Sequence, residues 1–209
     1  MINNYDKIAN YYDSLSRLVF GKSQLNAQIN QLKSITKNSS ILIVGGGTGW
    51  ILEEIGKLNP SGLKITYVEI SAKMLALSKD RDYGENSVLF IHSSIEDFKL
   101  EDHFNIILTP FLFDNFAQER CHLVFQKLDL RLNKDGLWFL VDFTTQPKSG
   151  KWWKKLFLKV MYKFFGLISD VEASNLIDMS PYFNDAGYKI IEERSYYGQF
   201  IKALIYQKK

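Results

Sequence analysis

The sequence predicts a single α/β domain with a seven-stranded, mostly parallel sheet preceded by two helices. Five short runs of branched apolar residues are nearly continuous rather than alternating, which is typical of parallel strands buried on both faces. Helical stretches lie between most of these runs, as in other α/β domains. The last two strand-like runs, 188–195 and 199–207, are separated by three residues. A link this short allows an antiparallel hairpin but no helical crossover, so we expect the C-terminal strand to be antiparallel.

The expected elements follow a regular order along the chain. Two helices without a strand partner come first, and the apolar strands and their helices then alternate. In chain order, the elements are helices 4–20 and 23–36, strand 41–44, helix 50–58, strand 63–68, helix 71–79, strands 88–91 and 104–108, helix 117–132 and strand 137–141. No internal repeat or linker is apparent, so we assign residues 1–209 to one domain with 1–37 as an N-terminal helical cap.

Composition narrows the class of protein. The chain has 26 basic and 23 acidic residues, a net charge of +3, which is too balanced to indicate a nucleic-acid partner. The single cysteine, Cys121, forms no internal disulfide or cysteine zinc site, and the three histidines lack metal-ligand spacing, so we expect no metal. No signal peptide and no apolar run long enough to span a bilayer is present, which predicts a cytoplasmic protein.

A glycine-rich loop follows the first strand. Segment 41–50 reads as an apolar strand, the pattern Gly45-x-Gly47-x-Gly49, and then the start of a helix. A phosphate-binding P-loop is excluded because Gly49 is followed by Trp50 rather than by Lys and Ser or Thr. The fingerprint of a dinucleotide site is weak because Trp50 also replaces its third glycine, so an NAD-dependent oxidoreductase is a minor alternative.

An acidic residue ends the second strand. Glu69 lies about 20 residues beyond the glycine loop, where a carboxylate accepts hydrogen bonds from both ribose hydroxyls. The loop and Glu69 together therefore indicate a ligand that contains a nucleoside without requiring a pyrophosphate.

These segments resemble the class I S-adenosylmethionine-dependent methyltransferases, and the start of the chain, 5–13, is similar to the ubiquinone/menaquinone-biosynthesis type, which acts on small molecules. Segments 41–49, 70–75 and 90–98 are similar to the loops that hold the methionine, ribose and adenine in this family. The resemblance implies a Rossmann-like, doubly wound fold and S-adenosylmethionine as cofactor. The cofactor-binding residues it implies are Tyr12, Gly45, Gly46, Gly47, Thr48, Gly49, Glu69, Ile70, Met74, Ser94, Ile95 and Thr109.

Two positions depart from the family pattern. Ile43 stands where the family usually has an acid that orients the glycine loop, and Ser94 stands where an Asp usually meets the adenine amino group. Each change removes interactions on the scale of about 1 kcal/mol. A methyltransferase-fold protein that binds partners without catalysis is therefore the second hypothesis beside an active methyltransferase.

Two acids are candidates for catalysis. Asp114 follows the fourth strand and Asp142 ends the fifth, so both belong to the carboxyl edge of the sheet, where α/β proteins bind ligands. A base is needed only if the acceptor must lose a proton. The alternatives are a helix N-cap for Asp114 and a solvated strand end for Asp142.

A basic, aromatic segment spans 148–170. On a helix, lysines at four-residue spacing form one stripe, and Trp, Phe and Met side chains occupy the other face. Such a helix, 151–168, is either a lid over the acceptor pocket or a contact to a membrane surface. Both readings favour a small hydrophobic or aromatic acceptor. The lysines concerned are Lys151, Lys155, Lys159 and Lys163.

Overall fold

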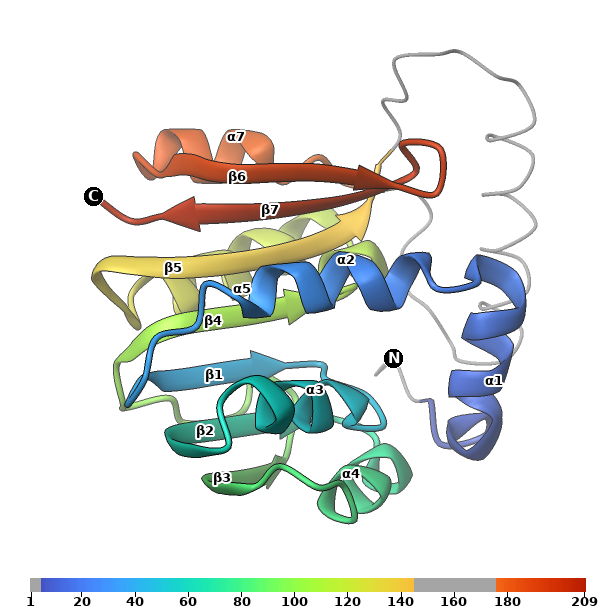
Figure 1. Ribbon diagram of the computed structural model, residues 1–209. Helices are drawn as coiled ribbons and strands as arrows, with labels where there is room; N and C mark the ends of the chain where they lie inside the picture. Colours follow the sequence, from blue (N-terminus) through green and yellow to red (C-terminus); the bar gives the residue numbers. More distant parts are fainter. Residues whose placement is uncertain (1–4, 145–175) are drawn as a thin grey trace.

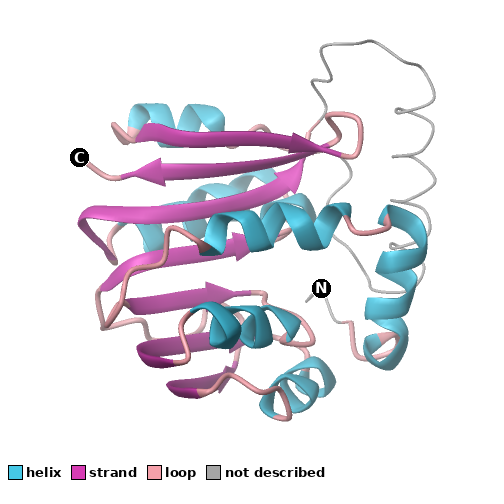
Figure 2. Ribbon diagram, in the orientation of Figure 1, coloured by secondary structure: helices cyan, strands magenta, loops and turns pink. Residues whose placement is uncertain are grey.

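The computed structural model describes residues 5–144 and 176–209. The predicted helix at 148–170 lies outside these residues. The described chain forms a seven-stranded sheet in the order β3-β2-β1-β4-β5-β7-β6, with helices on both faces (Figures 1 and 2). All neighbouring strands from β3 to β5 are parallel, and β7 is antiparallel to both β5 and β6. The predicted fold class is therefore confirmed.

The elements lie close to the predicted positions. The strands are β1 (Ser40–Val44), β2 (Ser61–Glu69), β3 (Glu85–His92), β4 (Phe104–Pro110), β5 (Leu132–Phe143), β6 (Lys189–Tyr196) and β7 (Ile201–Gln207). The helices are α1 (Ala9–Phe20), α2 (Ser23–Leu32), α3 (Trp50–Leu58), α4 (Ala72–Lys79), η1 (Phe113–Asn115), α5 (Gln118–Asp129) and α7 (Ser180–Asp185), of which η1 is a 3-10 helix.

The sheet separates two apolar cores because successive strand residues point to opposite faces. In β1, Ile41 and Ile43 pack against α3, whereas Leu42 and Val44 belong to the core that α5 and α7 cover. Helix α2 lies across β5 and β7, where the buried Gln31 amide donates to two backbone carbonyl oxygens, at 3.2 Å and 2.9 Å. Figure 1 shows the resulting layers, with α2 and α3 in front of the sheet and α5 and α7 behind it.

Some boundaries differ from the sequence-based expectation. Helix α1 begins at Ala9 rather than at residue 4, because residues 5–8 form a turn in which the N–H of Ile8 donates to the carbonyl oxygen of Tyr5. Strand β5 begins at Leu132, earlier than expected, with a shift of register before Ile106 pairs with Leu137. The short helices η1 and α7 were not predicted, because each has too few residues to show a helical period.

The parallel strands end on the side of the sheet where α1 lies, as their arrowheads in Figure 1 show. The strand order reverses between β1 and β4, and ligands of open α/β sheets bind at the carboxyl ends beside such a reversal. Among the described residues, no helix has the length and apolar character needed to cross a bilayer.

Candidate functional site

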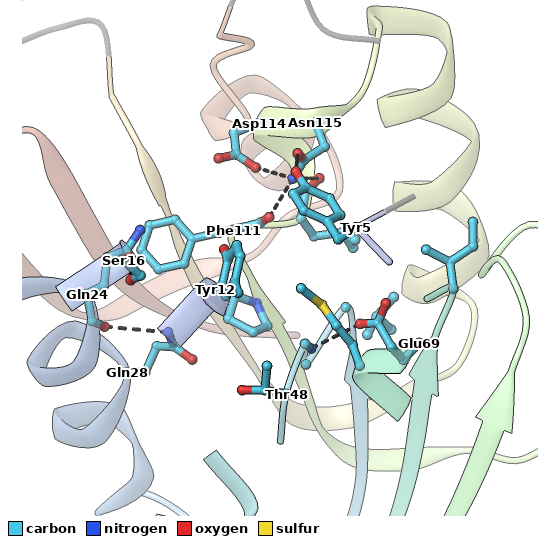
Figure 3. Close-up of a pocket in the computed structure, with 18 of the residues that line it drawn as sticks. Tyr5, Tyr12, Ser16, Gln24, Gln28, Thr48, Glu69, Phe111, Asp114 and Asn115 are labelled. Atoms are coloured by element: carbon cyan, nitrogen blue, oxygen red, sulfur yellow. Dashed lines mark hydrogen bonds between the residues drawn. The ribbon is translucent and has the colours of Figure 1, made fainter. Parts of the chain in front are cut away.

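A cavity of about 180 Å³ lies at the carboxyl ends of β1, β2 and β4. The glycine loop and Glu69 border one side, and α1 and α2 border the other (Figure 3). The turn after β4, with Asp114 and Asn115, borders a third side. The cavity therefore lies at the edge of the sheet where the sequence predicts a nucleoside-containing ligand.

The glycine loop has a backbone that requires glycine. Gly45, Gly47 and Gly49 have φ angles of 69°, 65° and 79°, in the left-handed region that side chains disfavour. Gly46 lies so close to the ring of Tyr67 that a Cβ atom would collide with it. The loop can therefore present its backbone directly to a ligand.

Tyr67 of the neighbouring strand β2 anchors this loop. Its hydroxyl donates to the carbonyl oxygen of Gly47 at 3.0 Å, and the ring is fully buried. Tyr67 pairs in the parallel register with Ile43, the position where the family pattern has an acid. A hydroxyl from the neighbouring strand thus supplies an anchor for the loop where Ile43 offers no polar group.

Glu69 is fixed by two backbone amides. The N–H of Gly47 donates to Oε2 at 3.0 Å, and the N–H of Ser71 donates to Oε1 at 2.8 Å. Burial raises the pKa of the Glu69 carboxyl, while these amides favour the charged form. The Ile70 N–H also bonds this carboxylate, and since the two oxygens together have about four lone-pair sites, the group keeps the capacity to accept a hydroxyl. This geometry suits a ribose.

Arg81 joins α1 to the glycine loop. Its guanidinium donates to the Asp13 carboxylate, the Glu53 carboxylate and the Thr48 carbonyl oxygen, each at 3.0 Å. The Thr48 hydroxyl also donates to Asp13, at 2.7 Å. Thus α1, α3 and the loop meet at one guanidinium.

The chain before α1 is attached at two further places. Asp6 accepts from the hydroxyl of Ser71 and, at 3.1 Å, from the N–H of Lys73, at the start of α4. The Tyr5 hydroxyl donates to the side-chain oxygen of Asn115. Residues 5–13 consequently cross the cavity with a contact on three of its walls.

Asn115 orients Asp114. Its amide nitrogen donates to the Phe111 carbonyl oxygen at 2.7 Å and to Oδ1 of Asp114 at 2.6 Å, as the dashed lines in Figure 3 show. Both amide protons are therefore used, and Tyr5 fixes the amide oxygen. The Asp114 carboxyl, which lines the cavity, is held in one direction.

Asp142 lies behind this turn. Its carboxylate accepts from the N–H of Phe143 at 2.9 Å and from the N–H groups of Phe113 and Asp114. Burial raises the pKa of Asp142 to about 7. Burial also raises the pKa of Asp114 well above its ordinary value, and the nearby Asp142 carboxylate raises it further. Two carboxyls from adjacent strands thus interact at the cavity wall.

The remaining wall is aromatic with polar amides. Phe20, Phe111 and Phe143 line it, and their rings pack together at centroid distances of 5.3 Å and 5.0 Å. Gln24 and Gln28 of α2 line the same side (Figure 3). This half can accommodate a planar apolar group with a few hydrogen bonds.

Most of the predicted cofactor residues lie around the cavity, although Gly49 and Thr109 are not among the described residues that line it. The Thr109 hydroxyl is in the core, where it accepts from the Trp138 indole at 2.9 Å. The hydroxyl of Ser94 donates to Asp97 at 2.7 Å. The predicted cofactor residues that line the cavity are Tyr12, Gly45, Gly46, Gly47, Thr48, Glu69, Ile70, Met74, Ser94 and Ile95.

The two candidate acids have different positions, since Asp114 lines the main cavity whereas Asp142 lines a second one of about 90 Å³. Sequence reasoning missed several lining residues on α1 and α2, because the spacing along a helix marks only its apolar face, and it also missed Phe143 at the end of β5. The missed residues on the two helices are Asp13, Ser16, Arg17, Phe20, Gln24 and Gln28. Within the described part of the chain, no group of three or more potential metal-ligating side chains is assembled.

Comparison with known proteins agrees with this geometry. A family described as "Methyltransferase domain" matches residues 41–136. The malonyl-[acyl-carrier protein] O-methyltransferase of Bacillus cereus is 29% identical over 142 residues, which cover 67% of this chain and 48% of that protein. The chain thus spans about half the length of this curated relative.

Solved structures share the fold. Magnesium protoporphyrin IX methyltransferase from Synechocystis with bound SAH has a TM-score of 0.67 at 14% identity, covering 98% of this chain and 97% of that chain. Human N-acetylserotonin methyltransferase in complex with SAM has a TM-score of 0.66 at 15% identity, covering 96% and 55%.

Residues 41–136, which hold the glycine loop and its acidic partner Glu69, thus match a methyltransferase domain. This match, the Bacillus relative and the shared fold support a class I S-adenosylmethionine-dependent methyltransferase.

Proposed function

We infer that this protein binds S-adenosylmethionine and transfers its methyl group to a small hydrophobic or aromatic acceptor. The observation that carries the inference is the Glu69 carboxylate, which backbone amides hold at the cavity beside the glycine loop with its left-handed backbone. An oriented carboxylate at the end of β2, about 20 residues beyond such a loop, suits the two hydroxyls of a ribose.

The residues present fit the cofactor. Glu69 would accept the ribose hydroxyls, and the loop from Gly45 to Thr48 would lie against the methionine end. Ile70, Met74, Ser94 and Ile95, which line the same cavity, would surround the adenine. When bound, S-adenosylmethionine supplies an electrophilic methyl group on a sulfonium. The chain's own contribution is to align the acceptor with that methyl group and exclude water.

The acceptor class follows from the opposite wall. Phe20, Phe111 and Phe143 offer an apolar surface, while Gln24 and Gln28 offer hydrogen bonds. An aromatic or otherwise hydrophobic molecule with one or two polar groups fits such a lining. The methyltransferase relatives support transfer as the reaction, and the lining supports the choice of acceptor.

Calorimetric titration with S-adenosylmethionine and S-adenosylhomocysteine tests this function. The wild type should bind both with micromolar affinity. Glu69→Gln should weaken both by at least about 10-fold, because the side chain loses its charge and one acceptor oxygen. The matched control is Glu54→Gln, whose carboxylate pairs with Lys57 at the surface. Absence of binding by a folded wild type would contradict the proposal.

A further inference from the structure

Asp114 lies at the boundary between the two halves of the cavity. Figure 3 shows it beside Asn115 and above Phe111, with Tyr5 on the side toward Glu69. Burial, and then the charges of Asp114, Asp13 and Glu69, raise the pKa of the Tyr12 hydroxyl. This hydroxyl therefore lies within electrostatic range of both Asp114 and Glu69. The carboxyl of Asp114 is thus near the place where a methyl group would pass from cofactor to acceptor.

The carboxyl is built to face the cavity. Asn115 engages Oδ1, and Asn115 is itself fixed by Tyr5 and by the Phe111 carbonyl. Such a chain of bonds restricts the carboxyl to one orientation. Asp142 accepts from the N–H groups of the turn and holds that turn against β5. Neither arrangement is needed for an acid that only caps a helix.

The charges around this point select among acceptors. Asp13, Glu69 and Asp114 all line the cavity, and Asp142 lies directly behind it. Asp13 is paired with Arg81, and Arg17 and Arg120 also line the cavity, so repulsion of an acceptor that is already an anion is confined to the wall where Asp114 and Asp142 lie. They attract an acceptor that donates a hydrogen bond. The acceptor should therefore carry its proton into the site.

We propose that the acceptor is an aromatic hydroxyl compound and that Asp114 is the catalytic residue that removes its proton, with Asn115 and Tyr5 as positioning residues. This rests on the proposed function. The acceptor oxygen bonds to the methyl carbon as the carbon–sulfur bond of S-adenosylmethionine breaks and its electron pair stays on sulfur. The acceptor's proton passes to the Asp114 carboxylate.

Burial strengthens this base. Because burial and the neighbouring Asp142 raise the pKa of Asp114, its carboxylate is a better match for a weakly acidic hydroxyl than an ordinary Asp would be. The other charged or titratable groups that line the cavity are Tyr5, Tyr12, Asp13, Arg17, Glu69, Glu96 and Arg120, of which Arg120 pairs with Glu96.

The test uses 2-naphthol and 2-methoxynaphthalene, two probes of nearly equal shape that differ in the hydroxyl proton. We expect the S-adenosylhomocysteine-loaded wild type to bind 2-naphthol at least 10-fold more tightly than its methyl ether, measured by calorimetry. Asp114→Leu replaces the carboxyl group with an apolar side chain of similar size. This variant should abolish the preference while its affinity for S-adenosylhomocysteine changes less than threefold. The matched control is Asp102→Asn, an exposed acid outside the cavity, which should keep the preference.

Methyl transfer gives a second readout. Wild type incubated with S-adenosylmethionine and 2-naphthol should form 2-methoxynaphthalene, and Asp114→Asn should lower its rate at least 100-fold, the scale of general base catalysis. Equal binding of the two probes, binding of neither, or a preference that survives Asp114→Leu would overturn the inference. Failure of the wild type to bind the cofactor would instead overturn the proposed function on which the inference depends.

Discussion

At the scale of single residues, Tyr67 has the most specific role that the structure assigns. Its hydroxyl is the anchor of the Gly47 carbonyl, and its ring fills the space that Gly46 leaves open. The pKa of Tyr67 is raised well above its ordinary value, first by burial and then by the charge of Glu69, so the hydroxyl remains a donor at all physiological pH values.

Tyr67→Phe should therefore weaken S-adenosylmethionine binding without unfolding the protein. Loss of one buried hydrogen bond costs about 1 kcal/mol, which corresponds to roughly fivefold in affinity. Calorimetry on the variant checks this. Tyr83→Phe is the control, because Tyr83 packs on Phe90 and lies outside the cavity lining. Unchanged affinity in Tyr67→Phe would show that the loop needs no anchor from β2.

At the scale of elements, α1 is attached to the rest of the domain through polar contacts more than through a broad apolar face. Of its residues, only Ala9 and Phe20, at the two ends, are buried. Arg81 supplies the contact near its middle, through Asp13. Near its middle, α1 is thus held over the cavity by the two contacts of Asp13, one from Arg81 and one from the Thr48 hydroxyl.

Arg81→Met should release α1 from the loop while leaving the sheet intact. We expect a loss of about 1–2 kcal/mol in the free energy of unfolding, because three partly exposed polar contacts disappear. Hydrogen exchange should become faster in 9–20 but not in the strands. Arg131→Met, which removes a surface contact to the Glu101 carbonyl, serves as the control. Equal exchange in 9–20 for both variants would refute this role of Arg81.

At the scale of the whole molecule, the carboxyl pair makes stability depend on pH. The pKa of Asp142 is about 7 in the folded chain and near its ordinary value when unfolded, so the unfolded state gives up its proton first. The stability this group contributes is complete below pH ~4 and is lost as pH rises through about 7.

Asp142→Asn should remove that dependence. The free energy of unfolding of the variant, relative to that of the wild type, should rise by on the order of 2 kcal/mol between pH 4.5 and pH 8. Urea unfolding at both pH values measures this difference. This figure allows for the partial exposure of the side chain. If the free energies of unfolding of the wild type and of Asp142→Asn changed equally between pH 4.5 and pH 8, the raised pKa of Asp142 would be contradicted.

How much the sequence could predict depends on the range of each interaction. The strands were predictable because their apolar runs are local, and Glu69 because it ends one of them. Asp114 and the glycine loop are also next to strand ends. In contrast, the bond from Arg81 to Asp13 joins residues 68 positions apart, and that from Tyr5 to Asn115 joins residues 110 apart. No local period encodes such contacts, so the bonds that fasten the N-terminal segment to the cavity became visible only in the folded chain.

The attachments of residues 5–13 also concern how quickly the cofactor exchanges. They fasten one strap of chain to the glycine loop, to α4 and to the turn after β4, which are three walls of one cavity. A nucleoside beside that strap would leave more readily when these bonds open. Residues 5–13 would then contribute to the dwell time of the spent cofactor.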